Sequence, residues 1–213
     1  DGGSTDGTVE LIQQHGSRVT HQVSEPDRGI YDAMNKGIRA ATGDVIGILN
    51  SDDHYAHPDV VATVALRMAF GHLDALLGDV AFFRAADPTR LVRRYRSAGF
   101  TPARLAWGWM PAHPGLFVRR AVFDGVGLYR TDYRIAGDYE WIARAFKPGA
   151  LRYAHEDAVL VHMQTGGVST RSWRNNLLLN QEVLRACREN GIHTNWLMLL
   201  SKYPRKLLEY LRP

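Results

Sequence analysis

The sequence predicts an α/β fold with a largely parallel sheet. Strand-like and helical patterns alternate along the chain, the apolar run at residues 45–49 is short and continuous, and an acidic pair follows this run closely. Strands that alternate with helices are typical of α/β folds. A short continuous apolar run is expected of a strand that is buried on both faces.

The first third of the chain is expected to hold three helices and two strands. Capping residues at 4–6 precede a helical pattern that ends at Gly16. Residues 18–23 alternate like a short strand, and apolar or small residues recur at helical spacing over residues 30–41. After the buried strand, Pro58 predicts the start of a helix that extends over residues 58–70.

The rest of the chain continues this alternation, except for an irregular stretch at residues 85–110 that is rich in arginine and aromatic residues. The expected strands are residues 75–77, 80–83, 116–118 and 159–161, and the expected helices are residues 138–146 and 172–190. The last segment, residues 196–211, is amphipathic and basic. The sequence has no evident repeat or linker that would divide it.

The composition is that of an ordinary globular protein. Of the 213 residues, 45% are hydrophobic and 23% are charged, which excludes a disordered, collagen-like or coiled-coil chain. The single cysteine, Cys187, excludes an internal disulfide and any zinc site built on several cysteines.

The net charge of +4 is unevenly distributed, with basic clusters at residues 90–104 and 202–212. Such clusters are either solvated surface or contacts to anionic lipid or a phosphorylated substrate. Nucleic acid is not an expected partner, because no recognition motif accompanies the charge. No apolar run approaches the roughly 18–20 residues of a spanning helix. We therefore expect a cytoplasmic protein, in peripheral contact with the inner face of the plasma membrane if the clusters bind lipid.

Asp52 and Asp53 lie just beyond the buried strand. Ligands of open α/β sheets bind beyond the carboxyl ends of the strands, and adjacent carboxylates repel each other unless a cation or a donor neutralises them. Mg²⁺ commonly binds one or two carboxylates together with substrate phosphates. The pair therefore predicts a metal-bound diphosphate, and the alternative is a turn whose aspartates cap the next helix.

Short blocks along the chain, taken in order, resemble family 2 glycosyltransferases. They are DGGSTDGT at 1–8, EPDRGIYDAMNKG at 25–37, ATGD at 41–44, NSDD at 50–53, GD at 78–79, HPG at 113–115, GDYE at 137–140 and GGVS at 166–169. The second block is similar to that of a subgroup that makes bacterial envelope polysaccharides and glycolipids. The resemblance covers residues 1 to about 170, and it rests on the order and spacing of the blocks.

This resemblance implies the GT-A fold, an α/β domain that binds nucleotide-diphospho-sugars and has a mainly parallel central sheet. It places Asp1 just after the second strand of the family, so the chain is expected to lack the first strand-helix-strand unit. Residues 1–170 would form the catalytic domain, and residues 171–213 a helical, basic C-terminal extension.

The resemblance also implies a metal site. Asp53 would bind the Mg²⁺ or Mn²⁺ that bridges the donor diphosphate, and Asp52 would contact the ribose or assist with the metal. His162 follows a short predicted strand, and some GT-A enzymes supply a third metal ligand from a histidine in such a position. The alternative for His162 is a structural role.

An inverting transferase needs a carboxylate that deprotonates the acceptor hydroxyl as it attacks. By resemblance this base is Asp138, in an acidic segment at a predicted helix start, and Glu140 is the competing candidate. The family often has glutamate before the aspartate, whereas this chain has Gly137. The alternative for Asp138 is a helix cap.

Donor contacts are expected in the first two blocks. In family members with two consecutive aspartates in the first block, the second reads the base, and here Gly2 occupies that place without a carboxylate. Asp1 either helps to bind the donor or holds the turn. Asp27 and Arg28 match a region near the nucleotide, where an arginine can pair with the diphosphate or stack on the base. The alternative for both is a surface turn.

Three residues are candidates for the acceptor side. His113 lies in a block that resembles the acceptor-side loop, where it would contact the acceptor or hold the loop. Glu140 and Trp141 follow the candidate base, and Trp141 would stack on a sugar ring unless it packs in the core.

The function predicted on these grounds is a metal-dependent inverting glycosyltransferase of the hexosyl type. It would move a sugar from a nucleotide-diphosphate sugar to a hydroxyl of a saccharide or a lipid-linked acceptor, in envelope polysaccharide or glycolipid biosynthesis. Three alternatives stay open: a GT-A-like nucleotidyltransferase, an inactive remnant, and a non-catalytic protein that binds glycan or membrane.

Overall fold

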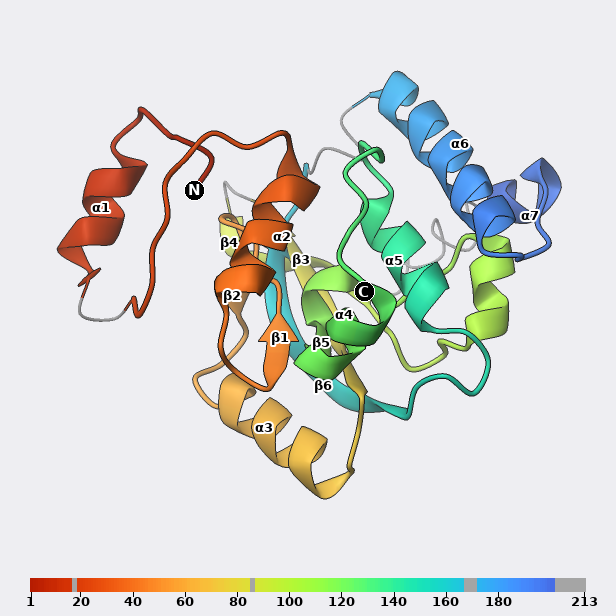
Figure 1. Ribbon diagram of the computed structural model, residues 1–213, viewed down its shortest axis with the longest axis horizontal. Coiled ribbons are helices and arrows are strands. Elements are labelled where there is room, and N and C mark those ends of the chain that lie inside the picture. Colours follow the sequence, from red (N-terminus) through yellow and green to blue (C-terminus); the bar gives the residue numbers. More distant parts are fainter. Residues whose placement is uncertain (17–18, 85–86, 167–171, 202–213) are drawn as a thin grey trace.

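The computed structural model describes residues 1–16, 19–84, 87–166 and 172–201. Within these ranges a six-stranded sheet has helices on both faces (Figure 1). The strands are β1 (Val45–Gly47), β2 (His54–Tyr55), β3 (Ala75–Arg84), β4 (Asp87–Tyr95), β5 (Leu116–Arg119) and β6 (Tyr153–Gln164). The helices are α1 (Thr8–Gln14), α2 (Ile30–Ala40), α3 (Val60–Phe70), α4 (Arg120–Val126), α5 (Gly137–Ala145), α6 (Trp173–Glu189) and α7 (Trp196–Leu200), with 3-10 helices η2 (Pro102–Trp107) and η3 (His113–Gly115).

The sheet is mixed, and the expectation of a mainly parallel sheet is wrong for the described strands. Their order is β1-β5-β3-β6-β2, with β4 beside β3. The β3–β6 pair is parallel, whereas β5 runs antiparallel to both β1 and β3, and β2 and β4 pair antiparallel with β6 and β3. The run at residues 45–49 is also not buried on both faces as expected, because β1 is an end strand of the described sheet, with Ile46 buried and Leu49 40% exposed. The apolar pattern therefore predicted a strand but neither its burial on both faces nor its direction.

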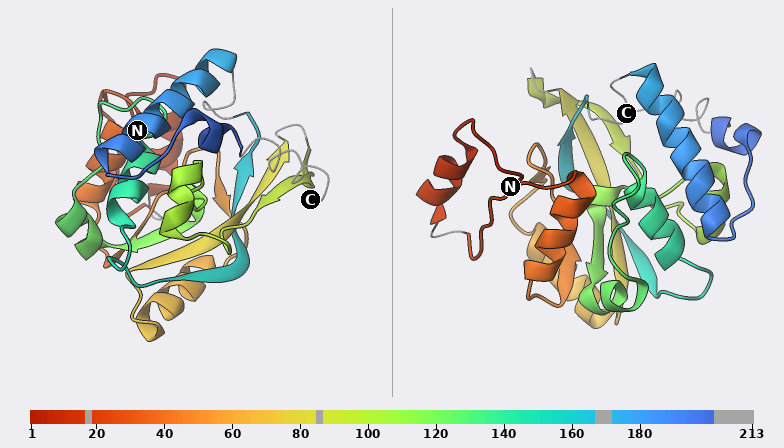
Figure 2. Two further views of the ribbon diagram at one scale, coloured as in Figure 1. Left: turned by 90° about the vertical axis from the view of Figure 1, so that its right-hand side faces the viewer. Right: turned by 45° about the horizontal axis from the view of Figure 1, so that its top comes forward.

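The two faces of the sheet have separate hydrophobic cores. Successive side chains of a strand point to opposite faces, and β3 follows this rule. Its residues Ala75 and Leu77 join the core formed with α2, α5 and α6, whereas Leu76 and Val80 join the core formed with α3. Figure 2 shows α3 on one side of the sheet and α5 and α6 on the other.

The segment before α2 contains no strand within residues 19–29, so the strand expected at 18–23 is wrong for its described part. Its side chains Val19 and Val23 are 38% and 44% exposed. The backbone touches the start of the chain, where the Asp1 ammonium donates to the Val23 carbonyl over 2.9 Å. Helix α1 buries none of its side chains and lies away from the sheet (Figure 1). Among the described residues, no strand lies beside this segment for it to pair with.

The predicted helices over residues 58–70, 138–146 and 172–190 are confirmed as α3, α5 and α6, and the two strands expected around residues 75–83 are one continuous strand, β3. Strand β4 lies in the stretch that looked irregular. Side chains of α6 such as Val183 belong to the same core as α5, so the described part of the expected extension packs against the sheet domain. The boundary at residue 170 stays a prediction.

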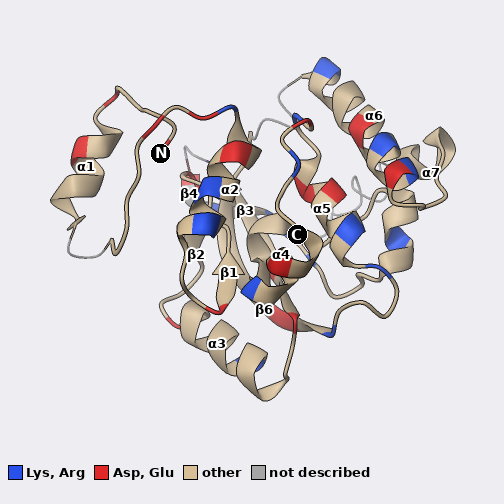
Figure 3. Ribbon diagram, in the orientation of Figure 1, with Lys and Arg blue, Asp and Glu red and all other residues tan. Residues whose placement is uncertain are grey.

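The basic cluster expected at residues 90–104 is partly structural. Arg93 is 7% exposed, with its guanidinium 4.6 Å from the centroid of the Phe82 ring. Arg94 pairs with the buried Asp79, with its Nη2 atom 2.7 Å from Oδ2. Figure 3 shows acidic and basic positions interleaved along α6, and the second basic cluster lies outside the described residues. None of the helices in the described part of the chain has the length and apolar character needed to cross a bilayer.

Candidate functional site

The predicted site residues come from six segments, two of which are the start of the chain, with Asp1, and strand β6, with His162. The turn after β1 carries the acidic pair, the loop before α2 carries the expected donor contacts, η3 carries a histidine, and the first turn of α5 carries the candidate base. Hydrogen bonds join α2 to the segment between α4 and α5, and β2 lies beside β6 through the pair His54–His162. The fold therefore links these segments in pairs, although they are far apart in the sequence.

Asp53 has a carboxylate oxygen that lacks a donor among the described residues. Its side chain is 9% exposed, and Oδ2 accepts a hydrogen bond of 2.7 Å from the Asn50 amide, while Oδ1 is buried without a hydrogen-bond partner. Burial raises the pKa of Asp53, and the bond from Asn50 opposes that shift. A desolvated carboxylate oxygen without a donor fits a bound cation. Its neighbour Asp52 is exposed.

His162 lies beside His54, which the sequence reasoning did not single out. Their Nδ1 and Nε2 atoms are 3.3 Å apart, and the two residues are partners in the β2–β6 register. Burial, with the neighbouring His54 as a smaller cause, lowers the pKa of His162. The ring is therefore neutral at pH 7, which is the form that binds metals. A histidine directly after an acidic pair was the signal that could have identified His54.

No group of three histidine, cysteine or acidic side chains converges as a metal site within the ranges that the structure describes. The fit to a cation rests instead on the buried Oδ1 of Asp53, since Mg²⁺ commonly takes one or two carboxylates and completes its shell with substrate phosphates and water. The residues present therefore fit a cation that is held mainly by Asp53 and completed by a ligand.

Asp138 lies in the first turn of α5, one residue inside the helix rather than at its cap, which is Ala136. Its side chain is half-buried. The Oδ1 atom accepts a hydrogen bond of 2.8 Å from the Tyr139 amide and lies 3.3 Å from the Tyr31 hydroxyl. A carboxylate at a helix N-terminus is favoured by the helix dipole. Asp138 is thus a partly accessible carboxylate in a fixed orientation.

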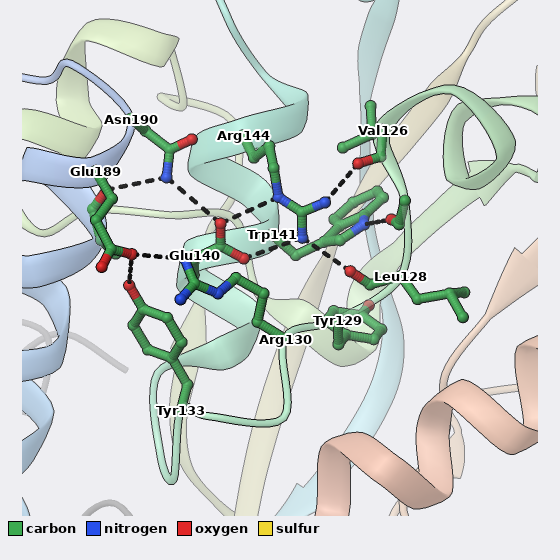
Figure 4. Close-up of polar contacts among 12 residues, drawn as sticks. Val126, Leu128, Tyr129, Arg130, Tyr133, Glu140, Trp141, Arg144, Glu189 and Asn190 are labelled. Atoms are coloured by element: carbon green, nitrogen blue, oxygen red, sulfur yellow. Dashed lines mark hydrogen bonds and ion pairs between the residues drawn. The ribbon is translucent and has the colours of Figure 1, made fainter.

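Glu140 is buried and ion-paired, so the expectation that it competes as base or faces the acceptor is corrected. It is 1% exposed, and its two oxygens accept from Nε and Nη2 of Arg144 over 3.0 Å each (Figure 4). Arg144 also donates to the carbonyls of Val126 and Leu128. The pair ties α5 to the end of α4, and both groups are committed to the fold.

Trp141 is likewise part of the core, which corrects its expected contact with a sugar. Its side chain is fully buried, its Nε1 donates to the Gly127 carbonyl over 2.7 Å, and its ring stacks on Phe123 with centroids 4.4 Å apart. A buried indole that satisfies its one donor in this way is a packing residue.

Glu140→Ala is expected to lower the free energy of unfolding by about 3 kcal/mol, because removing one partner of a buried pair leaves the other charge uncompensated. Urea denaturation followed by circular dichroism measures the loss. The matched control is Glu156→Ala, because Glu156 pairs with Arg67, which is half exposed, and such pairs contribute about 0–1 kcal/mol. Equal losses in the two variants would contradict this interpretation of Glu140.

The donor-side residues divide into one that shapes a turn and two at the start of α2. Asp1 accepts hydrogen bonds from the amides of Gly3 and Ser4 and from the hydroxyls of Ser4 and Ser24, so it holds its own turn. Asp27 accepts from the Gly29 amide over 2.8 Å. The Arg28 side chain is 81% exposed and lies 3.3 Å from Asp32.

A cavity of about 180 Å³ opens between the start of α2 and residues 131–134. Arg28 and Arg134 are among its lining residues, together with Tyr31 and Thr131. Asp32 and Asp132 also line it, and Asp32 pairs with Arg28, so the two cations are balanced by two carboxylates.

His113 points into the structure. It is 8% exposed, and its Nε2 lies 2.9 Å from the Tyr129 hydroxyl. Burial lowers the pKa of His113, although the nearby Asp138 charge opposes that shift. The histidine therefore holds the loop in its neutral form, which is the alternative that the sequence left open.

Comparison with known proteins gives consistent results. The sequence model described as "Glycosyl transferase family 2" matches residues 1–127. A "PGL/p-HBAD biosynthesis glycosyltransferase" of Mycobacterium tuberculosis is 31% identical over 192 residues, covering 87% of this chain and 69% of the relative. An uncharacterised glycosyltransferase of the same species is 34% identical over 177 residues, covering 80% of this chain and 63% of that protein.

Two solved structures share the fold at low sequence identity. TarS of S. aureus in complex with UDP superposes with a TM-score of 0.66 at 17% identity, covering 89% of this chain and 54% of that one. The mannosyltransferase PcManGT of Pyrobaculum calidifontis, in complex with GDP-Man and Mn²⁺, gives 0.57 at 19% identity, covering 87% and 53%. The chain thus spans about half the length of these two chains and about two thirds of the curated relatives.

The structural likenesses show a GT-A fold, as the sequence predicted. The family match covers more than half of the 213 residues, and the relatives are similar over most of the chain. This protein belongs to glycosyl transferase family 2.

Proposed function

We propose that the chain binds a nucleotide-diphosphate sugar together with Mg²⁺ or Mn²⁺ and transfers the sugar, with inversion, to a hydroxyl acceptor. The buried Oδ1 of Asp53 is the observation that carries the proposal. A buried carboxylate oxygen without a donor costs free energy unless a cation or a ligand completes it. Its position in the turn after β1 is where α/β folds bind ligands.

Asp53 would hold the metal, with His162 as a candidate further ligand and Asp52 near the ribose or the metal. A divalent ion there would neutralise the negative charge that develops on the leaving diphosphate. Arg28 and Arg134 line the cavity beside α2 together with Asp32 and Asp132, and the two arginines are candidate contacts for the diphosphate. Asp27 lies one residue before Arg28 and is a candidate donor contact. Asp1 shapes the loop.

Asp138 would act as the general base. Its carboxylate takes the proton of the acceptor hydroxyl while the acceptor oxygen bonds to the anomeric carbon and the bond from that carbon to the diphosphate breaks. Attack from the face opposite the leaving group inverts the configuration. The Tyr139 amide fixes Oδ1, so the orientation of the base is set before the acceptor binds.

The acceptor class follows from a relative. A related protein of Mycobacterium tuberculosis is named a "PGL/p-HBAD biosynthesis glycosyltransferase". With the resemblance of residues 25–37 to an envelope polysaccharide and glycolipid subgroup, this name supports a saccharide or lipid-linked acceptor of the cell envelope. The basic residues at 202–212 suit peripheral contact with an anionic membrane, since basic segments are attracted to such surfaces.

A panel of nucleotide sugars tests the proposal. Thermal melting is recorded with UDP-glucose, UDP-galactose, UDP-N-acetylglucosamine and GDP-mannose, each with and without Mn²⁺, followed by an assay for release of the nucleoside diphosphate. One donor is expected to raise the melting temperature by several degrees only when Mn²⁺ is present, because a ligand that binds the folded state stabilises it. The free nucleoside monophosphate is the control. Absence of both a shift and release for every donor would overturn the proposal.

A further inference from the structure

We propose that Tyr31 of α2 is a positioning residue for Asp138, and that Gly137 is the residue that admits it. The inference rests on the proposed function, because it concerns the base of that reaction. It adds a link between α2 and the start of α5 that was not among the expected site roles. Three groups of contacts carry the argument.

The first is the hydroxyl of Tyr31, which contacts one residue before α5 and one residue in its first turn. The side chain is 6% exposed, and its hydroxyl lies 2.6 Å from the Ile135 carbonyl and 3.3 Å from Asp138 Oδ1. Burial, with the Asp138 charge as a smaller cause, raises the pKa of Tyr31 far above its usual value. The hydroxyl therefore keeps its single proton, which makes a short bond to the Ile135 carbonyl and a longer one to Asp138 Oδ1.

The second is the Tyr31 ring, which occupies the space that a side chain at position 137 would need. A Cβ built on Gly137 would lie 2.7–2.8 Å from three atoms of that ring. Real Cβ atoms essentially never come this close to the atoms around them, so with the ring in this place position 137 requires glycine. The unusual Gly137 of the acidic segment is thereby explained, and the ring packs on the peptide that carries Asp138.

The third is the anchor of α2 one helical turn further along. Asn35 donates to the Tyr129 carbonyl over 2.8 Å and accepts from the Tyr129 amide over 2.9 Å. It is 3% exposed. Because residues four apart share a helix face, Tyr31 and Asn35 hold the segment before α5 at two points. The position of Tyr31 relative to Asp138 is therefore fixed by a rigid helix.

The charge of Asp138 acts on the pKa of three groups from the elements packed around it. They are Tyr31 from α2, Tyr129 from the segment after α4, and His113 from η3. Tyr129 is bonded to His113 through its hydroxyl, and both are buried and neutral. Tyr31 is the one of these three with a hydrogen bond to the carboxylate.

Tyr31→Phe tests the role, because it keeps the ring on Gly137 and removes only the hydroxyl. With the donor selected from the panel, the kcat for nucleoside diphosphate release is expected to fall by about tenfold or more, since loss of orientation at a reacting group is costly. The donor KM is expected to stay within twofold of the unmodified protein's value, and the melting temperature within a few degrees of it. Tyr129→Phe, which removes another buried hydroxyl, is the matched control and is expected to keep most of the kcat.

A double mutant separates a role through Asp138 from a general one. In an Asp138→Asn background, Tyr31→Phe is expected to cost no further activity, because residues that act as a unit are not additive. An unchanged kcat in Tyr31→Phe, or an equal loss in both backgrounds, would overturn the positioning role of Tyr31 and leave the assignment of Asp138 as base intact. Full activity in Asp138→Asn would instead overturn the base assignment and with it this inference.

Gly137→Ala tests the ring contact independently of turnover. The added methyl group overlaps the Tyr31 ring, so the melting temperature and the kcat are both expected to fall. Gly125→Ala, in helix α4, is the control, because a Cβ at Gly125 meets no atom within 4 Å. Alanine has a higher helix propensity than glycine, so this variant is expected to be at least as stable as the unmodified protein. A Gly137→Ala protein as stable and active as the Gly125→Ala protein would refute the packing argument.

Discussion

Asp138→Asn is expected to lower sugar transfer by about 100- to 10,000-fold, the usual contribution of a positioned general base, while donor binding and folding are retained. Asparagine has the same shape as aspartate, and its amide oxygen still accepts the hydrogen bond from Tyr139 and from Tyr31. It does not take up a proton at neutral pH, so the acceptor hydroxyl must attack without a base.

Initial rates of nucleoside diphosphate release with and without acceptor measure this loss, and the thermal shift with donor and Mn²⁺ measures binding. Asp124→Asn, at an exposed position of α4, is the control for loss of one negative charge. A rate within twofold of the unmodified protein would remove Asp138 as the base. A loss of the thermal shift in Asp138→Asn would mean instead that the residue contributes to donor binding.

Asp53→Asn is expected to abolish the stabilisation that Mn²⁺ and donor give together. The amide is a much weaker ligand for a hard cation than the carboxylate. Without metal, however, the variant is expected to melt no lower than the unmodified protein. Burial raises the pKa of Asp53, which means that the charged form is disfavoured in the folded state. At neutral pH its charge therefore costs stability, and the neutral amide removes that cost.

Melting curves with Mn²⁺ and donor, alone and combined, separate the two effects. Asp124→Asn is the control, because it removes an exposed carboxylate of α4 outside the proposed site and is expected to retain the combined shift. Binding of Mn²⁺ is also expected to weaken as the pH falls through the pKa of Asp53, because the carboxyl must lose its proton to bind metal. A full shift in Asp53→Asn would place the metal elsewhere.

Much of the architecture was predictable from local sequence. The apolar run of β1, the acidic turn after it and the helix that begins near Asp138 each depend on neighbouring residues, and the structure has all three. Strand direction was not predictable, because β5 is a short apolar strand whose pattern is the same in either orientation. Strand β4 was missed because its arginines look like solvated surface, whereas Arg93 is stacked and buried.

The candidate site was predictable in its acidic residues and much less so in its surroundings. Glu140 and Trp141 looked like acceptor contacts, but Arg144 and the Gly127 carbonyl, which satisfy them, are recognised only in three dimensions. Tyr31 and Asp138 are 107 positions apart. The sequence around Asp138 therefore could not predict that the ring of Tyr31 packs against Gly137.

Because the Tyr31 ring packs directly against Gly137, we expect these two positions to vary together in evolution, and they should be changed together in protein design. In homologues, a larger side chain before the base should occur together with a smaller residue at the α2 position, and tyrosine there should occur together with glycine. Grafting the glutamate-aspartate form of the acidic segment into this protein would require changing both positions at once. A library that varies position 137 alone would yield mostly destabilised proteins. It would therefore hide any effect of this position on activity.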